Sequence, residues 1–287
     1  MITSTDQLKA KIRNISKGNS DIAKNYMRVF FMERFLERVA ISEYRDQFIL
    51  KGGMLAASLL GVDMRSTMDI DTTVHALPLT IKDISSIINK ICSIELDDNV
   101  SFEIKSVDTI MDEFDYPGVR FHLDGYMNRI KQPIKIDIST DDEITPEAIK
   151  YEYSLMFEER TIKILSYNIE TLLAEKVQTV LNRGIANTRM RDFFDIYEIS
   201  RATKFSREIL KQAFSATCKK RETIFHDSDI SSVLDKIRNS KEMQTMWNRF
   251  VQKNTYAATL NWERVVEYVC EFIEIIAIGS QVNSDVK

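Results

Sequence analysis

Two aspartates on one short predicted strand place the strongest constraint on this chain. In the segment 69–74, polar and apolar residues alternate as they do in a half-buried strand. Alternation places Asp69 and Asp71 on one face, and carboxylates one pleat apart lie roughly 6–7 Å from each other along a strand. Because their like charges repel, the pair indicates a cation bound between them.

A pair of glycines precedes this strand. Gly52 and Gly53 follow a short predicted strand at 48–50 and lead into an apolar helical turn at 54–60. Because glycine has no Cβ, backbone N–H groups there and at the helix start can approach phosphate oxygens. Magnesium typically binds one or two carboxylates together with substrate phosphates. Either motif alone could be an ordinary turn or a solvated strand end, but together they favour a site for a metal-bound triphosphate.

A third carboxylate lies on a later strand. Three alternating segments, around 100–104, 119–123 and 134–139, predict further strands. The isoleucines of the last one share a face, which leaves Asp137 on the other. An isolated aspartate there is typical of a protein surface. Beside Asp69 and Asp71, Asp137 becomes the expected third metal ligand.

The second half of the chain is predominantly helical. A short strand at 161–164 is the last one predicted, and Asn168 is a typical helix N-cap. With 8 glycines and 4 prolines in the chain, long flexible linkers are not expected. We therefore predict an α+β protein in two domains. Residues 1–165 would hold N-terminal helices and a mixed or antiparallel sheet, and residues 166–287 would form a helical domain.

Two of these helices carry charge where packing alone does not require it. Lys176 lies on the apolar stripe of its helix, so it either extends to solvent at the edge of the core or directs its ammonium into a site. Asp192 and Asp195 share a face of the next helix, beside Arg189 and Arg191. The simpler interpretation of this second group is ordinary pairing within a helix.

Composition restricts the classes of partner. The net charge of −4 gives no overall nucleic-acid signature, so an RNA contact would use a local patch such as Arg183, Arg189 and Arg191. The three cysteines lie far apart without C-x-x-C spacing, which predicts neither a disulfide framework nor a zinc site and fits a reducing cytoplasm. No segment has the apolar length of a signal peptide or a membrane span. A cytoplasmic protein without a membrane partner is expected.

Taken in order, these motifs resemble the AbiEii/AbiGii toxin family of bacterial toxin–antitoxin and abortive-infection systems. The resemblance covers about residues 48–200 and rests on Lys51-Gly52-Gly53 with Leu55, the run 65–71, the run 136–138, Ala174-Glu175-Lys176 and the run 189–197. It implies a polymerase-β-like nucleotidyltransferase core, a helical C-terminal part, an NTP substrate with Mg²⁺, and a cognate antitoxin. Some family members are similar to enzymes that add nucleotides to the acceptor end of tRNA.

The resemblance also assigns residues. Gly52 and Gly53 stand at the family's nucleotide-binding loop, and Asp69 and Asp71 stand at its metal carboxylates. Lys176 and Asp192 match its later motifs. Classical nucleotidyltransferases have a serine after the first glycine, whereas this chain has Gly53 there and therefore lacks that hydroxyl.

These assignments give a catalytic hypothesis. Asp69 and Asp71 would hold two Mg²⁺ ions about 3.5–4 Å apart across the triphosphate, and Asp137 would complete one site and help to deprotonate the attacking hydroxyl. Asp192 would orient Lys176 or Arg189. The residues expected to contact the nucleotide or offset its charge are Lys51, Gly52, Gly53, Arg65, Thr67 and Lys176.

Two other functions remain compatible with the sequence. The same core could transfer a nucleotide to a small molecule, as antibiotic-modifying nucleotidyltransferases do. Alternatively, the chain could be a non-catalytic module that binds nucleotide or a partner protein. The intact aspartates at 69, 71 and 137 argue against loss of the site.

Overall fold

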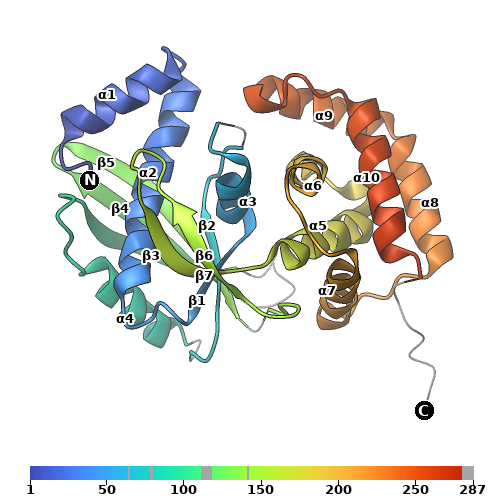
Figure 1. Ribbon diagram of the computed structural model, residues 1–287, viewed down its shortest axis with the longest axis horizontal. Coiled ribbons are helices and arrows are strands. Elements are labelled where there is room, and N and C mark those ends of the chain that lie inside the picture. The colour runs from blue at the N-terminus through green and yellow to red at the C-terminus, as the bar shows by residue number, and fades with distance from the viewer. Residues whose placement is uncertain (64, 78–79, 111–117, 141, 280–287) are drawn as a thin grey trace. The chain divides into compact units, whose positions relative to one another are not determined.

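The computed structural model describes residues 1–63, 65–77, 80–110, 118–140 and 142–279 (Figure 1). The chain divides into two compact units, each built from several segments. The first unit comprises Met1–Ser58, Ser66–Asp142 and Ile149–Ser166. The second comprises Leu59–Arg65, Glu143–Ala148 and Tyr167–Lys287.

A mixed sheet forms the centre of the first unit. In the described part of the chain it has seven strands in the order β3-β4-β5-β2-β1-β7-β6 (Figure 1). Their bounds are β1 Phe48–Lys51, β2 Ile70–Val74, β3 Ser101–Ile110, β4 Gly118–Met127, β5 Ile130–Thr140, β6 Ile149–Ser154 and β7 Thr161–Ser166. Strand β2 pairs antiparallel with β1 and parallel with β5. The α+β class predicted from the sequence is confirmed.

One strand was not predicted. Strand β6 lies at the edge of the sheet, and of its residues only Tyr153 is buried. An edge strand that packs one side chain into the core shows a weak hydrophobic pattern. Strands β1, β2, β4, β5 and β7 have more buried positions, and β3, in which only Ile110 is buried, was recognised from its alternation.

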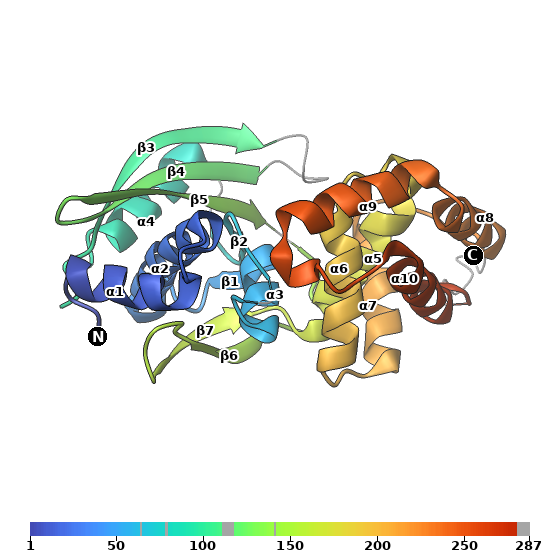
Figure 2. The ribbon, with the colours of Figure 1, turned by 90° about the horizontal axis from the view of Figure 1, so that it is seen from above.

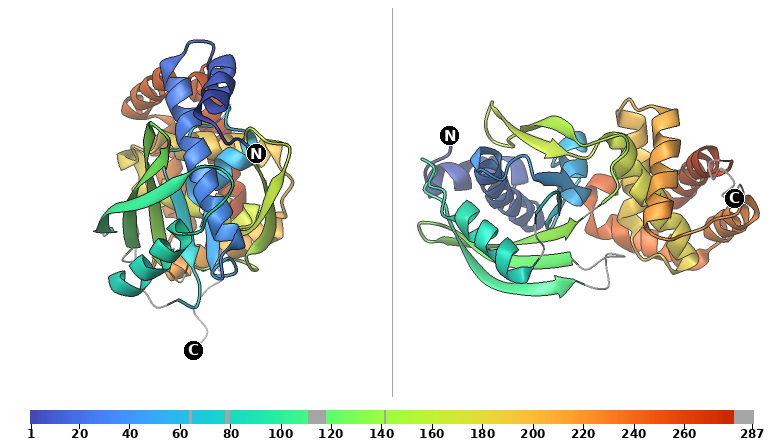
Figure 3. Two further views of the ribbon diagram at one scale, coloured as in Figure 1. Left: turned by 90° about the vertical axis from the view of Figure 1, so that its left-hand side faces the viewer. Right: turned by 90° about the horizontal axis from the view of Figure 1, so that it is seen from below.

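Helices cover one face of the sheet in this unit. They are α1 Thr5–Ser16, α2 Ser20–Ile41, α3 Gly52–Leu60 and α4 Ile81–Cys92. Helices α2 and α4 lie on the same side of β3, β4 and β5 (Figures 2 and 3). The approach of α2 is close, because a Cβ at Gly125 in β4 would lie 2.5 Å from the Phe31 ring. Alternation then leaves Arg120 in β4 and Asp137 in β5 on the face away from α2.

The second unit is helical. Its helices are α5 Ile169–Arg183, α6 Met190–Ala202, α7 Arg207–Lys220, α8 Asp227–Arg238, α9 Lys241–Lys253 and α10 Trp262–Ala277. Asn168 caps α5 as predicted, because its side chain accepts a hydrogen bond from the N–H of Thr171 at 2.7 Å. Among the described helices of the whole chain, none combines the length and the apolar character needed to cross a membrane.

Candidate active site

The three predicted metal carboxylates converge in the first unit. Asp69, Asp71 and Asp137, here called the carboxylate triad, each offer one oxygen, and these oxygens all lie within 4.8 Å of one another. The sheet produces this arrangement, because Asp71 in β2 is directly paired with Asp137 in the parallel strand β5. A donor set of carboxylate oxygens alone suits Mg²⁺, and three like charges at this separation repel without a cation. The triad therefore fits a divalent metal.

The glycine pair holds one of these carboxylates. The N–H of Gly53 donates a hydrogen bond to Asp71 Oδ2 at 2.8 Å. A Cβ at Gly52 would lie 2.1 Å from the same oxygen, and the φ of +58° at Gly52 is left-handed. From the sequence, the freed N–H groups are expected to face phosphate oxygens. In the structure, the N–H of Gly53 points to Asp71, so the pair has a second role that sequence reasoning missed.

Arg120 is a further site residue, which was not predicted from the sequence. Its Nε and Nη2 donate to Asp137 Oδ1 and Oδ2, both at 2.7 Å. The two residues are directly paired in the antiparallel strands β4 and β5. Alternation in β4 could have placed Arg120 on this face, but its pairing with Asp137 depends on a strand register that the sequence does not reveal.

Two other predicted nucleotide-binding residues have protein partners. The ammonium of Lys51 forms an ion pair with Asp142, and Ser139 Oγ also donates to Asp142 Oδ2, at 2.8 Å. Thr67 Oγ1 donates to the carbonyl oxygen of Asp69 at 3.2 Å, which supports the chain where it enters β2. The unit that holds the triad therefore also contains four of the predicted nucleotide-binding residues, Lys51, Gly52, Gly53 and Thr67.

Arg65, Lys176 and Asp192 lie in the second unit, where these buried residues form a group with buried Asp195 and exposed Arg189, here called the ion-pair cluster. Arg65 Nε and Nη2 donate to Asp195 Oδ1 and Oδ2 at 3.1 and 3.0 Å. Lys176 Nζ lies 2.6 Å from Asp195 Oδ2 and 3.2 Å from Asp192 Oδ1. Arg189 Nε lies 3.2 Å from Asp192 Oδ2. Asp192 thus contacts both residues it was expected to orient, and Lys176 is buried instead of extending to solvent.

Asp195 is the centre of this cluster and was not among the predicted site residues. Burial by itself would raise the pKa of Asp195. The charges of Arg65 and Lys176, and then their hydrogen bonds, outweigh burial and hold the pKa of this carboxyl below its usual range. Asp195 is therefore ionised at neutral pH and forms ion pairs with both cations.

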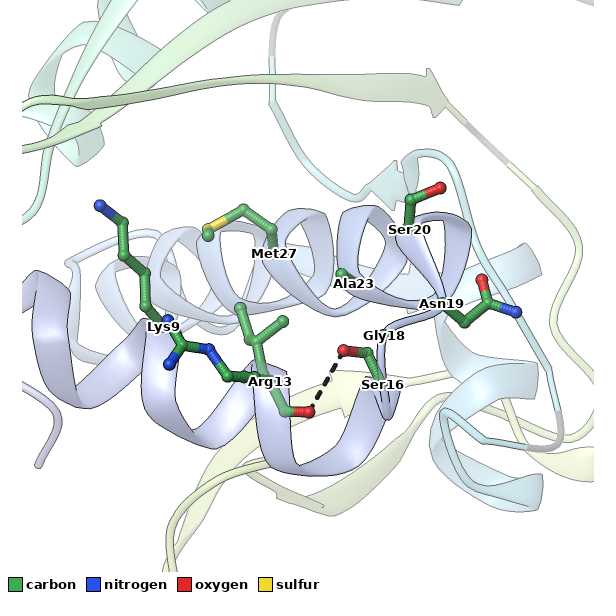
Figure 4. Close-up of a pocket in the computed structure, with 9 residues that line it drawn as sticks. Lys9, Arg13, Ser16, Gly18, Asn19, Ser20, Ala23 and Met27 are labelled. Atoms are coloured by element: carbon green, nitrogen blue, oxygen red, sulfur yellow. Dashed lines mark hydrogen bonds between the residues drawn. The ribbon is translucent and has the colours of Figure 1, made fainter.

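A separate groove lies between α1 and α2 (Figure 4). It has a volume of about 290 Å³. Apolar side chains such as Ile12, Ala23 and Met27 line it, with Lys9 and Arg13 among the cationic residues. It contains none of the predicted site residues.

A comparison with protein families identifies the chain. Residues 34–268 match the family described as "Nucleotidyl transferase AbiEii toxin, Type IV TA system". The chain belongs to this family. The resemblance found in the sequence is thus confirmed, and the chain is a nucleotidyltransferase. Membership in AbiEii also implies an NTP substrate, a divalent metal and an antitoxin partner. No curated protein matches the chain.

Solved structures similar to this AbiEii chain include two proteins from Helicobacter pylori. JHP933 has a TM-score of 0.46 at 14% identity, over 88% of this chain and 92% of that one. A putative nucleotidyltransferase has a TM-score of 0.47 at 14% identity, over 88% and 95%. The antibiotic-resistance factor ANT(2'')-Ia has a TM-score of 0.42 at 12% identity, over 69% of this chain and 95% of that one.

Proposed function

We propose that this AbiEii protein is a Mg²⁺-dependent toxin of the cytoplasm that transfers nucleotides from an NTP to an RNA acceptor of the tRNA type. The convergence of Asp69, Asp71 and Asp137 within 4.8 Å carries the proposal. Bound Mg²⁺ would polarise the triphosphate and neutralise the charge that develops on the leaving group. The family also supports an antitoxin that controls this activity.

The three carboxylates of the triad would have different roles in the transfer. Asp69 and Asp71 would hold the metal, with Asp71 fixed by the N–H of Gly53. Asp137 would orient the acceptor hydroxyl and take its proton. The hydroxyl oxygen bonds to the α-phosphorus, the bond from that phosphorus to the bridging oxygen breaks, and pyrophosphate leaves with the electron pair.

The ion-pair cluster would contribute positive charge. The cluster contains three cations and two carboxylates and therefore has a net charge of +1. The ion pairs hold Arg65 and Lys176 in place, but one positive charge is left over. We propose that Lys176 and Arg65 offset negative charge on the triphosphate. For the acceptor we propose the patch of Arg183, Arg189 and Arg191, at the end of α5 and the start of α6.

The deciding experiment supplies labelled NTPs, Mg²⁺ and total RNA to the protein. Label in RNA is expected, and it should be lost in Asp69→Ala together with toxicity in cells. Asp46→Ala, which changes an exposed aspartate paired with Arg45, serves as the matched control. Label in a small metabolite instead of RNA would establish the small-molecule alternative. Absence of any label, with toxicity intact in Asp69→Ala, would establish a non-catalytic binding module.

A further inference from the structure

Arg28 extends from α2 to the segment directly before β2, where the charge of Asp69 acts on it. Its Nη1 lies 2.7 Å from the sulfur of Met68, the residue directly before Asp69. A thioether is a weak acceptor, whereas a guanidinium carries five N–H donors. This contact places the guanidinium beside the residue that precedes Asp69 but satisfies little of its hydrogen-bonding capacity.

The surroundings of Arg28 favour an anion. Burial lowers the pKa of Arg28, and the charge of Asp69 opposes that effect. An arginine nevertheless stays protonated in proteins. Among the residues that the structure describes, no carboxylate forms an ion pair with Arg28. A half-buried cation of this kind lacks strong acceptors, which phosphate oxygens would supply.

Two other cations of this unit are engaged differently. Arg120 directs two donors to Asp137, and Lys51 pairs with Asp142. Both of these cations have carboxylate partners that are part of the same unit. Arg28 has a thioether instead, although it lies next to a carboxylate that is expected to hold a metal.

We propose that Arg28 binds phosphate oxygens of the nucleoside triphosphate whose metal is held by Asp69 and Asp71. This inference rests on the proposed function and adds a nucleotide-binding residue to it. The planar guanidinium can donate two parallel hydrogen bonds to one phosphate group, which a lysine cannot do. Arg28 would thus hold the triphosphate from the side of α2, with the metal between phosphate and carboxylates.

The test measures binding of Mg²⁺–NTP and of inorganic tripolyphosphate by calorimetry, without any acceptor. Arg28→Gln is expected to lower the affinity for both ligands by about ten-fold or more, because a charge-assisted hydrogen bond is lost. Arg28→Lys should lie between Arg28→Gln and the unchanged protein. Lys24→Gln changes an exposed cation of the same helix, paired with Asp21, and should have no effect.

Mn²⁺ binding without nucleotide separates this inference from the proposed function. Arg28→Gln should bind Mn²⁺ at least as tightly as the unchanged protein, because a nearby positive charge has been removed. Unchanged affinity of Arg28→Gln for NTP and for tripolyphosphate would overturn the inference. If Arg28→Gln raised only the KM for RNA, Arg28 would bind the acceptor and not the triphosphate. If the unchanged protein binds neither Mn²⁺ nor NTP, the proposed function itself fails. If Arg28→Gln does not fold, Arg28→Lys decides: unchanged affinity for both ligands overturns the inference.

Discussion

The carboxylate triad and the ion-pair cluster use the same kinds of side chain for opposite purposes. In the triad, three carboxylates converge within 4.8 Å, and Asp69 and Asp71 remain half-buried. In the cluster, Asp195 is fully buried and receives hydrogen bonds from both Arg65 and Lys176. The triad gathers three like charges, of which that of Asp137 is paired with Arg120, and this excess favours binding a cation. The cluster pairs opposite charges, which favours a fixed structure.

This difference makes Asp71→Asn the most damaging change to activity. Replacing a metal ligand should lower nucleotide transfer by about a thousand-fold or more. The folded state should be as stable as before or more so, because one of three repelling charges is gone and the amide oxygen can still accept from Gly53. Labelled-NTP transfer and thermal unfolding measure the two effects. A large loss of stability would show that the triad is a structural network.

Asp195→Asn should have the opposite profile. Removing one member of a buried ion pair costs about 3–5 kcal/mol, because Arg65 and Lys176 remain buried without their full counter-charge. Urea unfolding measures the loss. In the double variant Arg65→Gln/Asp195→Asn the loss should be smaller than the sum of the two single losses. Additive losses would show that the two residues do not stabilise each other.

Arg120→Lys should have an intermediate effect on activity. Lysine keeps the charge but cannot make both hydrogen bonds to Asp137, so transfer should fall by about 10–100-fold, as for other residues that orient a metal ligand. Mn²⁺ affinity should change by only a few-fold. Arg129→Lys, an exposed arginine between β4 and β5, is the control. Full activity of Arg120→Lys would mean that its two-point contact with Asp137 is unimportant.

The smallest expected effect concerns pH. The pKa of Asp195 is lowered from its ordinary 3.8, so the folded state binds this proton more weakly than the unfolded chain does. Its stabilising contribution is therefore complete above about pH 4 and lost as the pH falls below that value. The unfolding free energy of Asp195→Asn should depend less on pH between 4 and 2 than that of the unchanged protein. Equal dependence would mean that Asp195 is not ionised in the fold.

The sequence was sufficient for the parts of the site that follow from local periodicity. Asp69, Asp71 and Asp137 were recognised because alternation predicts each on the polar face of a strand, although Asp69 lies directly before β2, which begins at Ile70. Arg120 was missed because its importance comes from pairing with Asp137 in an antiparallel register. The contact between Gly53 and Asp71 was likewise outside sequence reasoning, since a glycine pair does not reveal which acceptor its N–H groups will face.

In the helical unit, the sequence predicted where helices begin and which of their faces are apolar, but it did not predict which charged side chains pair. The Asn168 cap and the apolar stripes follow from local patterns. Burial of Lys176 could not be decided, because an ammonium on an apolar stripe is compatible with either solvent or a buried partner. The decisive residue was Asp195, whose partner Arg65 is far away in the sequence.

The position of Arg65 has a consequence for any attempt to dissect this protein. The short segments Leu59–Arg65 and Glu143–Ala148 belong to the helical unit, although the sheet-containing unit surrounds them in the sequence. Cutting the chain after Ser166 would therefore not release two complete pieces. The C-terminal fragment would lack the arginine that neutralises Asp195, and the N-terminal fragment would carry two segments without their packing partners. The two units should therefore be expressed together as one chain.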